Sequence, residues 1–316
     1  MVHKIESLDM HAAHSCNLAC VSCSHFSNHG HAGLLSVEDA ENWMRPWRGR
    51  LRPELLSILG GEPTINPAVT AIFRVTRTQF HSAMIRIITN GFFLYRHPDL
   101  PRVLRDDPDG WLYLSVHHDS PSYLETITPI VDLLETWSAN YGIKLVVFRS
   151  FEDWTVRYKG FGDSMEPFED NEPHSSWMNC PAKNCRQLFE GKIWRCPPLT
   201  YLGLQSQRFR LSPKWNPYLT YRPLEPSCSD EELTRFLRSE HDSYCNMCPA
   251  KPQRIRPPLP LRIAPRPPRD RDGGARSHTV FERLDAISTQ DPRHENLQSQ
   301  PLALSRGEQS NAEHTE

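Results

Sequence analysis

Residues 16–23 read Cys16-Asn17-Leu18-Ala19-Cys20-Val21-Ser22-Cys23, which places three cysteines in a C-x3-C-x2-C pattern on one short segment. Thiolates are the usual ligands of iron–sulfur clusters. Three thiolates leave one iron of a four-iron cluster without a protein ligand, and an open coordination position is typical of a catalytic metal site. A zinc site is the alternative, with His14 or His25 as the fourth ligand.

Two further motifs lie downstream, each at the end of an expected strand. Gly60-Gly61-Glu62-Pro63 follows an apolar strand at 55–59, and Thr89-Asn90-Gly91 follows a second strand at 84–88. Glycine allows a backbone to approach a ligand closely. A carboxylate accepts a strong hydrogen bond from an ammonium group. Both motifs are therefore candidate parts of a ligand site.

The first half of the chain alternates strand and helix patterns. Strands are expected at 7–13, 55–59, 84–88, 111–116 and 143–148, and helices are expected to begin at Ser36, Asn66 and Ser120. Alternation of this kind predicts an α/β fold with a parallel sheet, and right-handed crossovers curl such a sheet into a full or partial barrel. The cysteine loop and both motifs then share the carboxyl ends of the strands.

Together, the cysteine triplet and the two strand-end motifs resemble the radical S-adenosylmethionine (SAM) superfamily over residues 7–150. The resemblance implies a partial (βα)6 TIM-type barrel with its active site at the strand C-termini. It also implies an enzyme whose 4Fe-4S cluster reductively cleaves SAM to a 5′-deoxyadenosyl radical, which abstracts hydrogen from a substrate.

The resemblance assigns roles to individual residues. Cys16, Cys20 and Cys23 would hold the cluster, and Gly60, Gly61 and Glu62 would hold the SAM amino group. Further implied SAM contacts at strand ends are Asn90, Ser115, His117 and Arg149. The sequence departs from the family at Ser22, where many members carry an aromatic residue that packs near adenine, so the adenine contacts stay undefined.

A second cysteine group lies between residues 180 and 248. Cys180, Gly191 and Cys196 form a C-x10-G-x4-C pattern, and Cys245 and Cys248 form C-x2-C. This arrangement is similar to the Twitch and SPASM domains, which bind auxiliary iron–sulfur clusters in many radical SAM enzymes. A turn at Gly191 would bring Cys196 back towards an earlier cysteine. The residues leave open whether Cys180 or Cys185 is the first ligand, what Cys228 does, and whether the metal is zinc.

These patterns divide the chain into three parts. Residues 1–150 are expected to form the barrel and 151–252 a small auxiliary-cluster domain. Residues 253–316 are rich in Pro and Arg and then polar, which predicts a disordered tail, apart from a helical turn near 280–287.

Composition and charge indicate which classes of partner and which compartment to expect. The net charge is −2 from 36 basic and 38 acidic residues, so no nucleic-acid or membrane partner is indicated. The N-terminus precedes no long apolar run, which predicts a cytoplasmic protein without a secretory signal. In that reducing compartment, nine cysteines favour metal chemistry over disulfides.

Three functions are compatible with the sequence. The first is oxidation or rearrangement of a small metabolite, the second is modification of a ribosomally made peptide, and the third is a non-catalytic iron–sulfur or zinc protein. Gly60-Gly61-Glu62 argues against the third, because a structural cluster needs no SAM motif. Either enzyme needs an external electron donor such as flavodoxin or ferredoxin.

Overall fold

A seven-stranded, mostly parallel sheet organises the computed structural model, which describes residues 2–261 and 278–291. The strand order is β5-β4-β3-β2-β1-β6-β7, and every neighbouring pair is parallel except β6 and β7. The strands are β1 His3–Ala13, β2 Leu51–Gly60, β3 Met84–Thr89, β4 Gly110–Val116, β5 Leu145–Arg149, β6 Cys185–Phe189 and β7 Lys192–Trp194. The α/β prediction and its first five strands are confirmed. The sheet is open, because β5 and β7 are its two edges.

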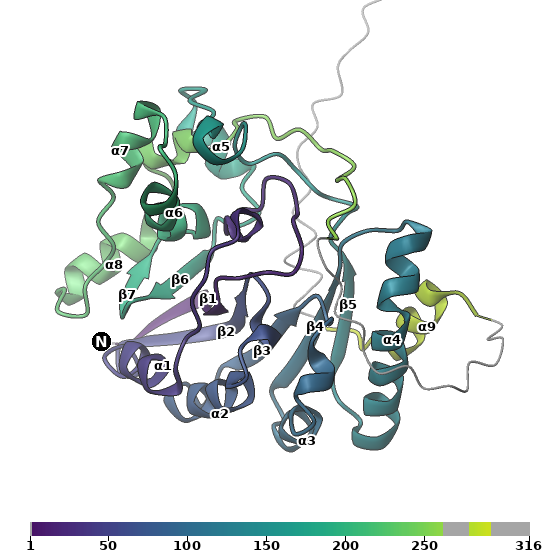
Figure 1. Cartoon of the computed structure of the whole chain (residues 1–316). Helices are drawn as coiled ribbons and strands as arrows, with labels where there is room; N and C mark the ends of the chain where they lie inside the picture. Colours follow the sequence, from purple (N-terminus) through teal and green to yellow (C-terminus); the bar gives the residue numbers. More distant parts are fainter. Residues whose placement is uncertain (1, 262–277, 292–316) are drawn as a thin grey trace, which may run out of the picture.

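Helices connect the parallel strands as expected. The connecting helices are α1 Val37–Met44, α2 Val69–Gln79, α3 Leu100–Asp106 and α4 Pro121–Tyr141. Ser36 caps α1 by accepting a hydrogen bond from the Asp39 N–H, and Ser120 caps α4 in the same way from Tyr123. Helix α3 was not expected from the sequence. Figure 1 shows α1–α3 in a row along one side of the sheet, with α4 beside β5.

The two faces of the sheet differ in chemistry. Apolar side chains such as Leu8, Ile58 and Ile87 belong to the main core that the helices cover. The opposite, interior face carries buried polar residues instead, because successive side chains on a strand point to opposite faces. These interior residues include Ser7, Asp9, His11, Ser57, Arg86 and Gln187. The concave side of the partial barrel therefore combines these polar residues with an apolar cluster of Leu55, Met84, Trp111, Tyr113 and Val146.

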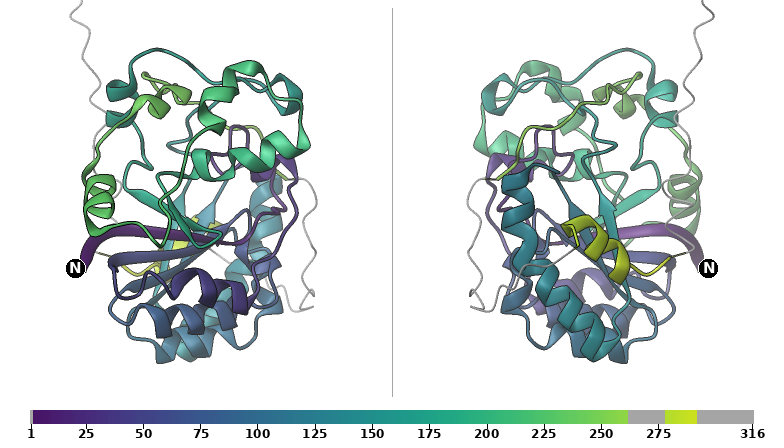
Figure 2. Two further views of the ribbon diagram at one scale, coloured as in Figure 1. Left: turned by 90° about the vertical axis from the view of Figure 1, so that its left-hand side faces the viewer. Right: turned by 90° about the vertical axis from the view of Figure 1, so that its right-hand side faces the viewer.

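The sheet continues past residue 150. Strand β6 pairs with β1, with Ser7 opposite Cys185 and Asp9 opposite Gln187. Glu190 and Gly191, both with positive φ, form the predicted hairpin turn to β7. The helices between residues 173 and 238 gather on one side of the sheet (Figures 1 and 2). They are α5 Pro173–Met178, α6 Pro197–Arg208, α7 Asn216–Leu219 and α8 Asp230–Arg238.

Part of the predicted tail packs on the barrel. The helical turn expected near 280–287 is confirmed as α9 Val280–Ile287, which lies against α4 and β5 (Figure 2). Arg283 of α9 binds Glu135 and Asp132 of α4. The next residues run along the β5 edge, where Ser288 Oγ accepts a hydrogen bond from the Val147 N–H at 3.1 Å. Most of the segment expected to be disordered lies outside the described residues.

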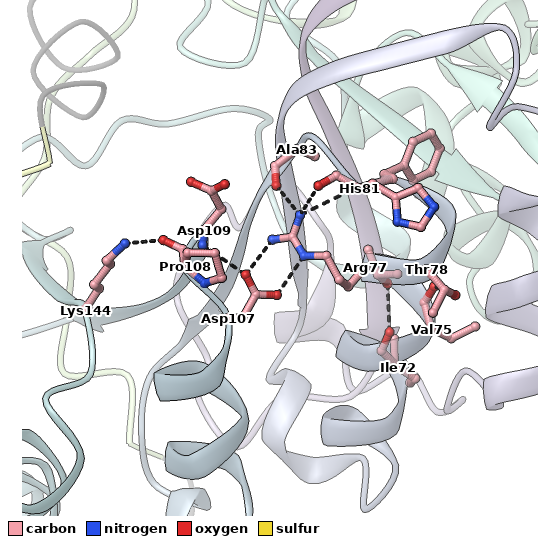
Figure 3. A network of polar contacts seen from close by, with 12 residues as sticks. Ile72, Val75, Arg77, Thr78, His81, Ala83, Asp107, Pro108, Asp109 and Lys144 are labelled. Carbon is pink, nitrogen blue, oxygen red and sulfur yellow. Dashed lines mark hydrogen bonds and ion pairs between the residues drawn. The ribbon is translucent and has the colours of Figure 1, made fainter.

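An ion pair ties α2 to the amino ends of β3 and β4. Arg77 binds both carboxylate oxygens of Asp107 at 2.7 and 2.9 Å, and its Nη1 also donates to the carbonyl of Ala83 at 2.7 Å (Figure 3). Asp107 in turn accepts the N–H of Asp109. This network lies at the end of the sheet opposite the cysteine loop.

We expect Arg77→Ala to lower the free energy of unfolding by about 2–4 kcal/mol, because it leaves the largely buried Asp107 carboxylate without its cationic partner. Urea denaturation measures the change. Arg102→Ala is the matched control, because the Arg102–Asp99 pair is exposed at 59% and 66% and is expected to contribute less than about 1 kcal/mol. Equal losses in the two variants would contradict the assigned role of the network.

Candidate functional site

The cysteine loop follows β1 and is bounded by the two strand-end motifs. Gly61 N–H donates to the Ala13 carbonyl at 2.9 Å, and Glu62 N–H donates to the Ser15 carbonyl at 2.9 Å. A Cβ on Gly60 would come within 2.1 Å of the Ala13 oxygen, and one on Gly61 within 2.3 Å of the Ser15 oxygen. Both glycines are therefore needed for the close packing of this motif against the start of the cysteine loop.

Glu62 is completely buried and joins the two motifs. Its Oε1 accepts hydrogen bonds from the Thr64 N–H at 2.9 Å and the Thr89 hydroxyl at 2.5 Å, and Oε2 accepts the Asn90 N–H at 2.7 Å. Burial raises the pKa of Glu62, while these donors act in the opposite direction. The carboxylate thus fixes the end of β2 to the end of β3.

Asn90 links this hydrogen-bond network to the first cysteine. Its Nδ2 donates to Asn17 Oδ1 at 2.8 Å and lies 3.9 Å from the sulfur of Cys16. The Leu18 N–H also points to the Cys16 sulfur, at 3.4 Å. The Gly60-Gly61-Glu62 and Thr89-Asn90-Gly91 motifs therefore form one hydrogen-bonded unit with the cysteine loop.

The other two cysteines have different neighbours. Cys20 Sγ lies 3.4 Å from His117 Nδ1. Burial raises the pKa of Cys23, and the backbone N–H groups of residues 25–28 oppose this by hydrogen bonding to its sulfur. Such a ring of N–H groups is a site for an anion, here a thiolate. The donor set, three thiols of which one faces this ring, fits a three-cysteine iron–sulfur cluster.

Residues that the sequence did not single out hold the loop from the other side. Trp154 Nε1 donates to the Val21 carbonyl at 2.8 Å. Ser22, in a left-handed conformation, accepts the N–H groups of Arg157 and Tyr158 at 2.6 and 3.1 Å. The position where the family often has an aromatic residue thus anchors the loop to the chain after β5. No periodic pattern in residues 151–160 indicated this.

Of the other residues predicted to contact SAM, some lie near the cysteine loop and others do not. His117 lies beside Cys20, and its backbone N–H donates to the Tyr123 hydroxyl at 3.1 Å. Ser115 is hydrogen-bonded to Ser150. Arg149 binds Asp285 of α9 through two contacts of 2.7 and 2.9 Å and packs over the Phe281 ring. The structure therefore joins Arg149 to the C-terminal segment and not to the cysteine loop.

The two histidines considered as zinc ligands contact another histidine. His25 Nδ1 lies 2.6 Å from His11 Nε2, and His14 Nδ1 lies 3.1 Å from His11 Nδ1. The His11 ring stacks on Tyr201 of α6 with a centroid distance of 3.8 Å. Across residues 2–261 and 278–291, no three His, Cys, Asp or Glu side chains are grouped to hold a single metal ion. A four-iron cluster is larger than one ion and separates its ligands more widely.

Four cysteines of the second group line one cavity. Cys180, Cys196, Cys245 and Cys248 share its walls with Trp177, Leu199, Tyr244 and Met247, among others. Burial raises the pKa of Cys248 to about 12, and the nearby Cys180 and Cys245 add to the effect. Cys196 is the N-cap of the twelve-residue helix α6. Burial raises the pKa of its thiol well above the usual value, while a hydrogen bond from the Leu199 N–H acts in the opposite direction. None of the nine cysteines forms a disulfide.

Cys185 and Cys228 lie away from this cavity. Cys185 begins β6, on the same face as Gln187, and burial followed by the charge of Asp9 raises its pKa. The strand register thus turns Cys185 to the barrel interior. Cys228 is 3.5 Å from Nη1 of Arg50.

His97 joins the two motif loops and gives the fold a pH dependence. Its Nε2 lies 2.8 Å from the Thr64 carbonyl, and burial lowers its pKa below 6.5. Just below pH 6.5, the unfolded chain therefore binds a proton at His97 that the folded chain does not bind. This contribution to stability is present above pH 6.5 and is lost as pH falls through the folded pKa.

We expect the free energy of unfolding of the wild type to fall more steeply below pH 6.5 than that of His97→Gln, by up to about 1.4 kcal/mol per pH unit. Glutamine keeps a donor for the Thr64 carbonyl but does not titrate. Urea midpoints at pH 7.5, 6.5 and 5.5 provide the comparison. Parallel pH profiles would show that His97 is not a source of the dependence.

Comparisons with known proteins agree with this site. Residues 11–139 match the sequence model described as the Radical SAM superfamily. No curated protein sequence matches the chain. Within the described residues, no helix has the length and apolar character needed to cross a membrane.

Solved structures give weaker similarities. SuiB of Streptococcus suis bound to the precursor peptide SuiA is 19% identical, with a TM-score of 0.38 over 47% of this chain and 34% of that chain. BtrN in complex with AdoMet and 2-DOIA is 14% identical, with a TM-score of 0.43 over 76% of this chain and 85% of that chain. The chain thus spans about a third of the SuiB chain's length. The match at 11–139 contains the cysteine triplet and both motifs, so this part of the chain is a radical SAM domain.

Proposed function

We propose that this protein is a radical SAM enzyme with a second, auxiliary 4Fe-4S cluster, and that it abstracts hydrogen from a small polar metabolite to oxidise or rearrange it. The observation that carries the proposal is the linked unit formed by the cysteine loop and the two motifs, with Glu62 and Asn90 at its centre.

In this proposal Cys16, Cys20 and Cys23 hold the SAM-binding cluster, which when bound supplies the electron for reductive cleavage of SAM. The work of the chain itself is to fix geometry and exclude water. Glu62 holds the two motif loops together, and Trp154 and Ser22 hold the outer part of the cysteine loop against the chain after β5. A closed, ordered chamber protects a reactive species from side reactions.

The second metal site in this proposal has no open coordination position. Cys180, Cys196, Cys245 and Cys248 would complete it with four thiolates, which suits a cluster that exchanges electrons without binding substrate. The raised pKa values of Cys196, Cys245 and Cys248 mean that metal loading must displace protons. Two hydrogen bonds keep the cavity walls in place: Ser176 Oγ donates to the Cys248 carbonyl, and Asn179 Nδ2 donates to the Ala250 carbonyl.

The interior face of the sheet supports a polar substrate. Asp9 accepts hydrogen bonds from Ser7 and from Gln187, each at 3.0 Å, and Tyr201 donates to Gln187 at 3.3 Å. Small-molecule sites use a few well-placed polar groups of this kind to orient a substrate. We propose a hydroxyl-bearing metabolite because its hydroxyl groups can exchange with these donors and acceptors, which here bind one another.

A pair of cysteine substitutions tests the auxiliary site. Cys180→Ala is expected to reduce iron from about eight to about four atoms per chain, because one ligand of a closed cluster is lost. Cys185→Ala is the matched control and should leave iron unchanged. Iron and acid-labile sulfide are measured after anaerobic reconstitution. The reverse result would place Cys185 in the site, and zinc in place of iron would refute the auxiliary cluster.

The enzymatic proposal is tested by anaerobic reconstitution, reduction with flavodoxin, ferredoxin or dithionite, and quantification of 5′-deoxyadenosine after SAM is added. Hydroxylated metabolites and short peptides are then compared as additives. Faster deoxyadenosine release with a metabolite supports the proposed substrate class, whereas faster release with peptides alone would refute it. No deoxyadenosine under any condition, from protein with full iron and sulfide content, would refute the catalytic proposal.

A further inference from the structure

One amide nitrogen in the cysteine loop is buried and has no hydrogen-bond partner among the described residues. Nδ2 of Asn17, the residue after Cys16, is shielded from solvent and makes no hydrogen bond to any of the described residues. A buried donor without an acceptor costs free energy, and most such groups in native proteins are satisfied by protein atoms, ordered water or a bound ligand. The position of Asn17 beside Cys16 suggests that a bound group does so.

The orientation of this amide follows from its neighbours. The Phe92 N–H, which can only donate, lies 3.2 Å from Asn90 Oδ1, so the oxygen and nitrogen of the Asn90 amide are fixed. Asn90 Nδ2 then points to Asn17 at 2.8 Å, and the atom of Asn17 that receives it must be the oxygen. The NH2 end of Asn17 is therefore the end that is left for a ligand.

We propose that Asn17 donates this N–H to an anionic acceptor of the cofactors at the cysteine loop, with Asn90 as its positioning residue. The acceptor is a sulfur of the cluster or a carboxylate oxygen of SAM, since an amide N–H suits both. This inference rests on the proposed function. It adds a contact from the loop itself, and it explains why the Asn90 side chain reaches both Asn17 and the Cys16 sulfur.

The test uses Asn17→Ala, which removes the donor, and Asn17→Asp, which replaces it with a negative oxygen of similar shape. Asn216 is exposed at the start of α7 and provides the matched Asn216→Ala and Asn216→Asp controls. Three quantities are measured on the loaded proteins: iron and sulfide content, the cluster midpoint potential without SAM by EPR-monitored titration, and the dissociation constant for SAM.

Each acceptor predicts a distinct result. If Asn17 binds a cluster sulfur, the midpoint potential becomes more negative without SAM, more so for Asn17→Asp, because hydrogen bonds to sulfur favour the reduced cluster. Loss of iron from a folded Asn17 variant also supports this acceptor. If Asn17 binds SAM, the potential is unchanged and the SAM dissociation constant rises about tenfold or more in Asn17→Ala, with a larger rise in Asn17→Asp.

Iron content, potential and SAM affinity that match those of the Asn216 controls in both Asn17 variants would overturn the inference. Its failure is distinguishable from failure of the proposed function. A wild type that holds a cluster and binds SAM normally, with unaffected Asn17 variants, removes the inference alone. A wild type that shows no cluster signal removes the proposed function instead.

Discussion

Simultaneous replacement of Cys16, Cys20 and Cys23 by alanine is expected to reduce 5′-deoxyadenosine formation to the background of a reaction without protein. These thiols are the three that the loop offers to the SAM-binding cluster, and the ring of backbone N–H groups around Cys23 favours the thiolate that a cluster requires. Iron should fall by about four atoms per chain, as one of two four-iron clusters is lost. Anaerobic reconstitution followed by mass spectrometry measures both effects.

Cys228→Ala is the matched control for this prediction, since Cys228 is near Arg50 and lines neither the N-terminal loop nor the cavity of the other four cysteines. It should retain full iron and activity. Deoxyadenosine formed at wild-type rates by the triple variant would exclude the N-terminal loop as the cluster site. A loss of the same size in Cys228→Ala would show that cysteine removal acts through folding.

Gly61→Ala is expected to lower the rate of deoxyadenosine formation by about 100-fold, the effect of a displacement near 1 Å in a catalytic site. The new Cβ would come 2.3 Å from the Ser15 oxygen and 2.8 Å from the His14 oxygen. Both obstacles are backbone atoms, which cannot rotate away as a side chain would. The start of the cysteine loop must therefore shift, and the cysteines shift with it.

Gly49→Ala provides the control, because nothing lies within 4 Å of a Cβ at that position. The rate, the iron content and the urea midpoint are compared across both variants. A Gly61→Ala protein with normal iron and normal rate would show that the loop tolerates the displacement. Loss of activity with normal iron would mean that the shift affects SAM and leaves the cluster intact.

Much of the barrel could be predicted because its signals are local. Apolar runs mark β2 to β4, serines at 36 and 120 cap their helices as expected, and parallel strands bring their carboxyl ends together. The cysteine spacing and the two motifs were likewise readable along the chain. Helix α3 was missed, since it has only seven residues and a weak periodic pattern.

The choice between Cys180 and Cys185 could not be made from the sequence. Their spacings to Gly191 are both plausible, and only the pairing of β6 with β1 decides which way each thiol points. With Gln187 opposite Asp9, Cys185 joins the interior face, while Cys180 lines the cavity with Cys196 and the C-x2-C pair. Side-chain direction on a strand depends on register, which is a property of the partner strand.

The contacts of Arg149, at the edge of the barrel, could not be predicted from the sequence either. Its place at the end of β5 predicted a ligand contact, but α9, more than 130 residues later, supplies its partner Asp285. The α/β class, the cysteine loop and the motif positions could be predicted, because each depends on neighbours along the chain. Which side chains face the barrel interior, the auxiliary cavity or the C-terminal segment depends on long-range packing, because those contacts join residues that no local pattern relates.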